Sequence, residues 1–109
     1  MKNQDATLPE FDSQLEVDYA SYLQGLLYGG IIMKWWHHPM RLRLAPKTSY
    51  QPDFMVQMGK SLILYEVKGF RRDDAMVKLK VAAALYPCFR WQLVTREKRE
   101  WIFKEIGNG

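Results

Sequence analysis

The sequence has little cysteine and no long hydrophobic run. Only Cys88 of its 109 residues is a cysteine, so no internal disulfide can form, and a lone thiol favours a reducing cytoplasm over secretion. No stretch approaches the roughly 18 apolar residues that a membrane helix needs, and no apolar run follows the start at Met1. These absences argue against a disulfide-stabilised secreted domain and a membrane protein, and they predict a cytoplasmic location.

Internal repeats, linkers and low-complexity tracts are also missing, so residues 1–109 are predicted to form one domain. Hydrophobic residues make up 48% of the chain and aromatic residues 14%, which is a globular composition. A domain of this length can bury roughly 65% of the surface that its unfolded chain exposes, enough for a single core.

Acidic charge is scarce after the first 30 residues. Residues 1–30 carry a net charge of −4 and residues 31–109 a net charge of +8, which together give the overall +4. A basic surface of this size favours a polyanionic partner, and nucleic acid is the most common one. Charge alone is a weak indicator, because many basic proteins bind no nucleic acid.

Apolar residues at a helical period predict a first helix over residues 13–28. They are Leu15, Tyr19, Tyr22, Leu23 and Leu26. The glycines that follow, Gly29 and Gly30, tolerate the left-handed conformation that ends many helices. Residues 31–44 mix β-branched and aromatic residues around Pro39 and predict two short strands, and residues 45–49 are expected to form a loop.

The second half of the chain predicts a helix, a strand and another helix. Asp73 and Asp74 can cap a helix that runs to about residue 85. Residues 89–94 are expected to form a strand, and residues 97–106 a terminal helix, because Trp101, Ile102 and Glu105 have near-helical spacing. The whole order predicts an α/β or α+β fold, with a central mixed sheet flanked by helices.

Between these halves lies a predicted hairpin that brings acidic residues together. Residues 52–58 and 61–68 read as strands, and Gly59-Lys60 suits a two-residue type II′ turn. That turn would pair residues whose numbers sum to 119, placing Asp53 directly across from Glu66, with Lys68 on the same face. Opposed carboxylates repel, so compensation is expected from Lys68, from a Mg²⁺ ion, or from both. The backbone carbonyl of Val67 is a further candidate ligand.

The same residues carry a resemblance to a known family. Tyr50-Gln51-Pro52-Asp53-Phe54 followed by Glu66-Val67-Lys68-Gly69 resembles the PD-(D/E)xK nuclease superfamily, and more narrowly the phage endonuclease I-like Holliday-junction resolvases. The match covers about residues 13–94. It implies a restriction-endonuclease-like core of order αβββαβ and metal-dependent hydrolysis of DNA phosphodiester bonds. Mg²⁺ would be the cofactor, with Mn²⁺ able to substitute, and the location would be the host-cell cytoplasm.

Carried over by position, the resemblance implies that Asp53, Glu66 and Lys68 are catalytic, with both acids binding metal, and that Glu16 adds a helix-borne ligand. For Glu16 an equal alternative remains, because Ser13-x-x-Glu16 is a capping box in which the glutamate bonds the start of its own helix. A homodimer would supply two sites for cutting two strands, and a partner protein could supply specificity.

Two other functions stay open on the sequence: a nucleic-acid-binding module that does not cleave, and a structural phage protein with solvated acids. The acids Asp53 and Glu66 argue against a simple binder, because they repel phosphate. The basic residues nearest to the signature are candidates for phosphate contacts. They are Arg71, Arg72, Lys78 and Lys80.

Two remaining features are expected to be structural. His37 and His38 are adjacent, and adjacent strand residues point to opposite faces, so they are not expected to bind one ion, and zinc is not predicted. Cys88 precedes the last predicted strand and is expected to be buried and inert.

Overall fold

The structure is a computed structural model that describes residues 13–69 and 73–107. Along the chain its elements are α1 (Gln14–Tyr28), β1 (Lys34–His37), β2 (Leu42–Ala45), β3 (Thr48–Tyr50), β4 (Phe54–Met58), β5 (Ser61–Lys68), α2 (Asp73–Leu85), β6 (Arg90–Glu97) and β7 (Glu100–Ile106). Neither of these two helices is long and apolar enough to cross a membrane.

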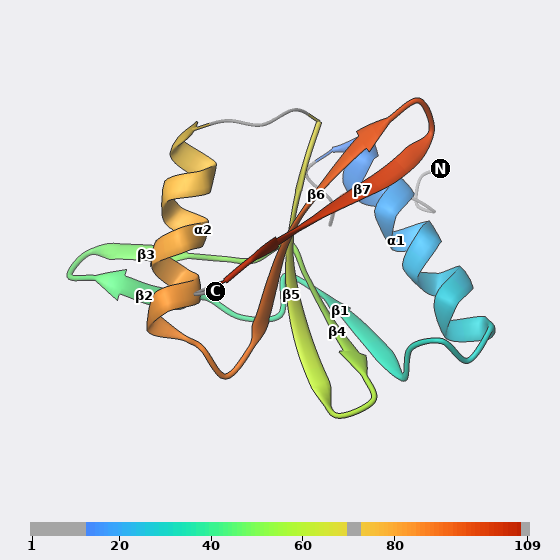
Figure 1. Ribbon diagram of the computed structural model, residues 1–109, viewed down its shortest axis with the longest axis horizontal. Coiled ribbons are helices and arrows are strands. Elements are labelled where there is room, and N and C mark those ends of the chain that lie inside the picture. The colour runs from blue at the N-terminus through green and yellow to red at the C-terminus, as the bar shows by residue number, and fades with distance from the viewer. Residues whose placement is uncertain (1–12, 70–72, 108–109) are drawn as a thin grey trace, which may run out of the picture.

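A mixed five-stranded sheet forms the centre of the domain, in the order β1-β4-β5-β6-β7 (Figure 1). Its neighbours are antiparallel except β5 and β6, which are parallel. Parallel neighbours need a crossover connection, and α2 lies in this one. The prediction of an α/β fold with a mixed sheet is therefore confirmed.

The two helices cover opposite faces of the sheet, because successive strand residues point to opposite sides. On β5, Ile63, Tyr65 and Val67 face α1, where they pack against Tyr19 and Leu23. Leu64 faces the other way and packs with the buried residues of α2 and its neighbours, namely Leu79, Ala82, Ala83, Trp91, Leu93 and Ile106. The predicted apolar face of the first helix is therefore confirmed for Tyr19 and Leu23, and Leu15, Tyr22 and Leu26 pack against the same core.

The predicted register of the hairpin is confirmed from Met58–Ser61 to Phe54–Tyr65. Gly59 has a φ of 60°, the left-handed region that the first position of a type II′ turn requires and that glycine adopts at low cost. The first helix also ends as predicted, at Tyr28, with the left-handed conformation at Gly30, whose φ is 77°.

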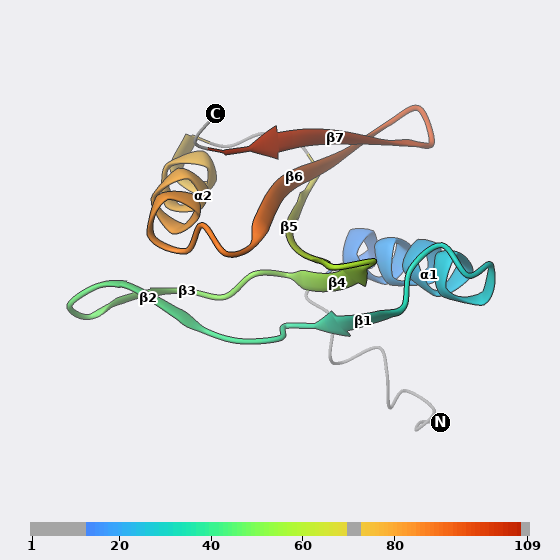
Figure 2. The ribbon, with the colours of Figure 1, turned by 60° about the horizontal axis from the view of Figure 1, so that its bottom comes forward.

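The loop predicted for residues 45–49 is wrong. Residues 48–50 form strand β3, which pairs with β2 in a separate two-stranded sheet beside α2 (Figures 1 and 2). Lys47, with a φ of 63°, makes the tight turn between them. The hairpin is anchored where the Tyr86 hydroxyl donates to the Arg43 carbonyl over 2.8 Å. This hairpin carries Tyr50 into the core.

The predicted terminal helix is also wrong, because residues 100–106 form strand β7, paired antiparallel with β6. Lys98 and Arg99 have φ values of 50° and 73°, as in a two-residue type I′ hairpin turn. The consecutive aromatic and β-branched residues 101–103 fit a pleated strand better than a helix, and Trp101 packs edge-on against Tyr19 at 5.0 Å between ring centroids. Tertiary contact with α1 outweighs the near-helical spacing.

Cys88 is exposed, which corrects the expectation that it is buried. It lies in the turn after Pro87, and the core positions that follow are filled by Phe89 and Trp91, whose rings meet edge-to-face. The thiol therefore has no packing role.

Candidate functional site

Three acidic side chains are buried in the part of the chain that the structure describes, and they are the ones predicted to bind metal. Glu16, Asp53 and Glu66 are 6%, 8% and 5% exposed. They come from α1, from the residue before β4 and from β5. Burying carboxylates is costly unless each is hydrogen-bonded or paired with positive charge, so their shared location needs a physical reason. We call these three residues the acidic centre.

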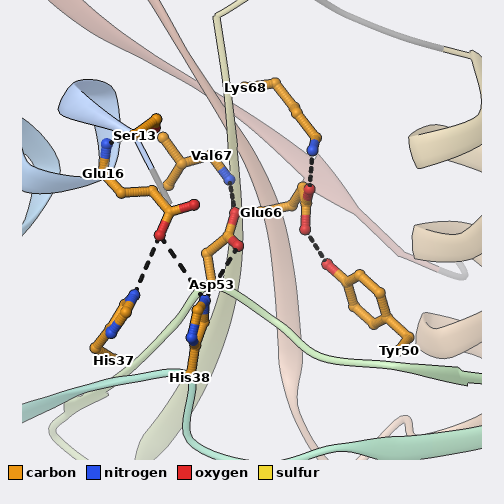
Figure 3. Close-up of polar contacts among 9 residues, drawn as sticks. All are labelled: Ser13, Glu16, His37, His38, Tyr50, Asp53, Glu66, Val67 and Lys68. Atoms are coloured by element: carbon orange, nitrogen blue, oxygen red, sulfur yellow. Dashed lines mark hydrogen bonds and ion pairs between the residues drawn. The ribbon is translucent and has the colours of Figure 1, made fainter. Parts of the chain in front are cut away.

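Asp53 lies in the middle of the acidic centre (Figure 3). Its N–H donates to the Tyr65 carbonyl over 3.0 Å, and its Oδ2 accepts the Val67 N–H over 2.8 Å. In the regular register Tyr65 pairs with Phe54, and Asp53 would pair with Glu66. The bond from Asp53 to Tyr65 is therefore shifted by one residue. The predicted position of Asp53, directly across from Glu66, is therefore modified: its carboxylate lies against the β5 backbone at Val67.

This environment changes the protonation of Asp53. Burial, followed by the negative charge of Glu66, raises the pKa of Asp53 to about 8, although the Val67 N–H and, more weakly, Lys68 act in the opposite direction. Glu16 adds a smaller upward contribution. Without a bound metal ion, Asp53 is therefore largely protonated at neutral pH. A metal ion bound beside it would favour the ionised carboxylate.

Glu66 has two partners on the α2 side of Asp53. Lys68 places its Nζ 2.8 Å from Glu66 Oε2, which confirms that the two side chains share a face. The Tyr50 hydroxyl donates to Glu66 Oε1, and both groups are buried. Burial, and then the charge of Glu66, raises the pKa of Tyr50, so its hydroxyl stays a hydrogen-bond donor. The β2–β3 hairpin thus positions a residue that orients Glu66.

Glu16 lies on the α1 side of Asp53. Ser13 caps the helix, because its Oγ accepts the Glu16 N–H over 3.3 Å. The Glu16 carboxylate points away from the helix start, and its Oε1 lies 3.1 Å from His37 Nε2 (Figure 3). Glu16 was interpreted either as a site residue or as the glutamate of a capping box. Its side-chain contact with His37 agrees with the first interpretation, while Ser13 caps the helix.

The prediction that His37 and His38 point apart is wrong. His37 ends β1, but His38 has a φ of 48°, which breaks the strand alternation. The two imidazole rings stack with centroids 3.8 Å apart. His38 Nε2 lies 3.8 Å from Glu16 Oε1 and 4.0 Å from Asp53 Oδ1. Both histidines therefore join the acidic centre, and we call them the histidine pair.

Glu16 and the histidine pair offer ligand atoms that all lie within 4.8 Å of one another, close enough for a metal ion to bind all three. Sequence reasoning excluded this group, because the turn at His38 is a local backbone feature. The doublet of histidines before a proline was the only signal in the sequence. Tyr50 was also missed as a site residue, although it stands in the same motif as Asp53.

Of the predicted basic residues, the two that the structure describes, Lys78 and Lys80, make no contact with the acidic centre. Lys78 and Lys80 are exposed on α2, on either side of the buried Leu79. Lys80 lines an open pocket with Lys104 instead. Arg71 and Arg72 lie outside the described residues. Among the described residues, the cation that contacts the acidic centre is Lys68.

Val67, a predicted backbone ligand, lies beside Asp53. The contact that the structure shows is through its N–H, which is donated to Asp53 Oδ2. Comparison with protein-family models, with curated proteins and with solved structures finds no match for this chain, so its residues alone carry any functional assignment.

Proposed function

We propose that this chain is a metal-dependent endonuclease that acts on DNA, with a restriction-endonuclease-like core formed by α1, β1, β4, β5, α2 and β6. One observation carries the proposal: Glu16, Asp53 and Glu66, distant in the sequence, are buried together beside Lys68. The proposal is supported because these are the residues that the resemblance to the PD-(D/E)xK superfamily implies, and they come from a helix and a hairpin. An ordinary exposed strand face would leave these carboxylates solvated.

The acidic centre offers carboxylate oxygens, which are the ligands that hard divalent cations prefer. Its carboxylates outnumber the cation Lys68 that contacts them, and burial, followed by the negative charge of Glu66, raises the pKa of Asp53 to about 8. Oxygen ligands of this kind suit Mg²⁺, which we propose as the cofactor, with Mn²⁺ able to substitute. Asp53, Glu66 and Glu16 would hold it, together with the Val67 carbonyl. A divalent ion bound there supplies an acidified water as nucleophile and an electrophile for a phosphate oxygen.

The chain's own groups would then have separate tasks. Asp53 is fixed by the Val67 N–H and cannot rotate freely, so it presents its other oxygen, Oδ1, to the site. Tyr50 holds one oxygen of Glu66 and Lys68 holds the other. Because Lys68 is also partly exposed, its ammonium can leave Glu66 to orient the attacking water or to offset charge on the phosphate.

DNA is the proposed substrate because of the charge distribution. The net charge of +8 on residues 31–109 attracts phosphate, whereas the acidic centre without a cation repels it. A pure binding module would gain nothing from such a centre. We propose that the enzyme acts in the cytoplasm, as a homodimer or with a partner protein where two strands are cut.

The test is an incubation of the protein with supercoiled, single-stranded and four-way-junction DNA, with and without Mg²⁺ or Mn²⁺. The variants are Asp53→Ala and Lys68→Ala, and the matched control is Glu100→Gln, which removes an exposed carboxylate on β7. We expect metal-dependent cleavage of at least one substrate by the wild type and the control, and its loss in both site variants.

Two results would contradict the proposal. Cleavage that persists in both Asp53→Ala and Lys68→Ala would show that the site is elsewhere or that a contaminant cuts the DNA. No cleavage of any substrate by a folded wild type, together with retained DNA binding, would indicate the binding module instead.

A further inference from the structure

We propose that Glu16, His37 and His38, with Asp53 as a fourth ligand, bind a first-row transition-metal ion more tightly than Mg²⁺. The site shares Glu16 and Asp53 with the proposed nuclease centre, but it does not depend on cleavage of DNA by the chain. It assigns a role to the histidine pair, which the PD-(D/E)xK pattern does not include.

The separations between ligand atoms suit such an ion. Metal–nitrogen bonds to zinc measure about 2.0–2.1 Å, which puts neighbouring ligand atoms about 3.0 Å apart in octahedral geometry and about 3.3 Å apart in tetrahedral geometry. Glu16 Oε1 lies 3.1 Å from His37 Nε2 and 3.8 Å from His38 Nε2. Asp53 Oδ1 lies 4.0 Å from His38 Nε2. The ligand atoms of Glu16, His37 and His38 all lie within 4.8 Å of one another, and Asp53 reaches this group through its contact with His38.

The backbone holds the two rings in this arrangement. His37 is fixed in the sheet, where it pairs with Phe54, and the His38 N–H donates to the Asp53 carbonyl over 2.9 Å. The positive φ of 48° at His38 then places its ring on the same side as that of His37. Non-glycine residues seldom adopt this conformation, and strained positions of this kind cluster at functional sites.

The chemistry of the ligands decides which ion is preferred. Imidazole nitrogen suits zinc, copper, iron and nickel, whereas Mg²⁺ is a hard ion that selects oxygen ligands. The side chains of His37 and His38 are only 12% and 23% exposed, so their nitrogens face the carboxylates rather than bulk water. A site of two imidazoles and two carboxylates should therefore discriminate strongly against Mg²⁺.

Metal binding is testable on the intact chain without DNA. The chain holds two histidines in all, so its imidazole proton resonances report on this pair alone. With one equivalent of Zn²⁺, we expect large shifts of both imidazoles in the NMR spectrum, because both are ligands. One equivalent of Mg²⁺ should shift them much less, because it would bind the neighbouring carboxylates Glu16 and Asp53 and not the rings. Unmoved resonances with Zn²⁺ would overturn the proposal, as would equal shifts with both ions.

Variants then assign the ligands. Co²⁺ absorption and calorimetric titration with Zn²⁺ should be done in a Cys88→Ser background, because the thiol of Cys88 is exposed and binds soft ions. We expect Glu16→Gln and the double variant His37→Gln/His38→Gln to weaken Zn²⁺ binding at least about 10- to 100-fold. Glu100→Gln, an exposed acid on β7, is the control and should bind as tightly as the background.

Circular dichroism should be used to check that each variant is folded. If the folded histidine double variant binds Zn²⁺ as tightly as the control does, the site is refuted. The outcome is separable from that of the nuclease proposal. Histidine resonances that shift in a protein without nuclease activity would uphold the metal site and contradict the nuclease. If the protein cleaves DNA in Mg²⁺ but its histidine resonances do not shift with Zn²⁺, the nuclease proposal would be upheld and the histidine metal site contradicted.

Discussion

Replacing Asp53 by asparagine should make the metal-free protein more stable at alkaline pH. Asparagine keeps the shape of the side chain and an oxygen that can accept the Val67 N–H, but it cannot ionise. In the wild type, burial and the charge of Glu66 raise the pKa of Asp53 from 3.8 to about 8. The folded protein therefore keeps a proton that the unfolded chain releases over this range.

The sign and size of the effect follow from this proton. Because the folded state binds more protons than the unfolded state between pH 4 and pH 8, the free energy of unfolding falls as pH rises through this window. Each pH unit contributes about 1.4 kcal/mol, so the whole window corresponds to a loss on the order of 5 kcal/mol. Small domains have a total stability of about 5–15 kcal/mol, so the metal-free wild type should be marginal at pH 8.

Urea denaturation in the presence of a chelator, at pH 5, 6, 7 and 8, measures the effect. We expect the wild type to lose stability across this range and Asp53→Asn to lose several kcal/mol less. Glu100→Gln controls for the removal of a surface carboxylate. Parallel stability curves for the wild type and Asp53→Asn would refute the claim that Asp53 is buried among negative charges.

Three further predictions concern stability. Tyr50→Phe removes the hydroxyl that donates to the buried Glu66, and the free energy of unfolding in urea should fall by about 1–2 kcal/mol; an unchanged midpoint would contradict the hydrogen bond. The double variant Lys98→Asn/Arg99→Gly places residues that tolerate positive φ at both turn positions. The free energy of unfolding should rise by about 1 kcal/mol and the thermal midpoint should rise with it. A lower midpoint would argue against the β6–β7 hairpin. Leu79→Ala empties a fully buried position on α2 and should cost about 2–5 kcal/mol in the same urea assay, whereas a loss below 1 kcal/mol would place Leu79 outside the core.

The parts of the fold that were predictable are those governed by local chemistry. The two-residue turn with Gly59 predicted the hairpin register, the period of apolar residues predicted the first helix, and the capping aspartates predicted the second. The positions of Glu66 and Lys68 followed from that register, because residues two apart on a strand share a face. Proximity of Asp53 to Glu66 followed as well, although the irregular bond to Tyr65 moved Asp53 toward the β5 backbone.

The parts that were missed depend on contacts between distant segments or on single backbone angles. Strand β7 is stabilised by packing of Trp101 on α1, which local spacing does not reveal. Tyr50 meets Glu66 only because the β2–β3 hairpin folds beside α2. The histidine pair depends on one positive φ at His38, and strand alternation predicts the opposite arrangement.

The central claim is that the acidic centre is a catalytic metal site for DNA cleavage. The most direct measurement is the single-turnover cleavage rate of the best DNA substrate in Mg²⁺ or Mn²⁺ for the wild type, Asp53→Asn and the Glu100→Gln control. We predict that cleavage requires the metal and that Asp53→Asn is slower by at least about 100-fold, with the control unchanged. An equal rate in Asp53→Asn and the wild type, or cleavage in the presence of excess chelator, would contradict the account.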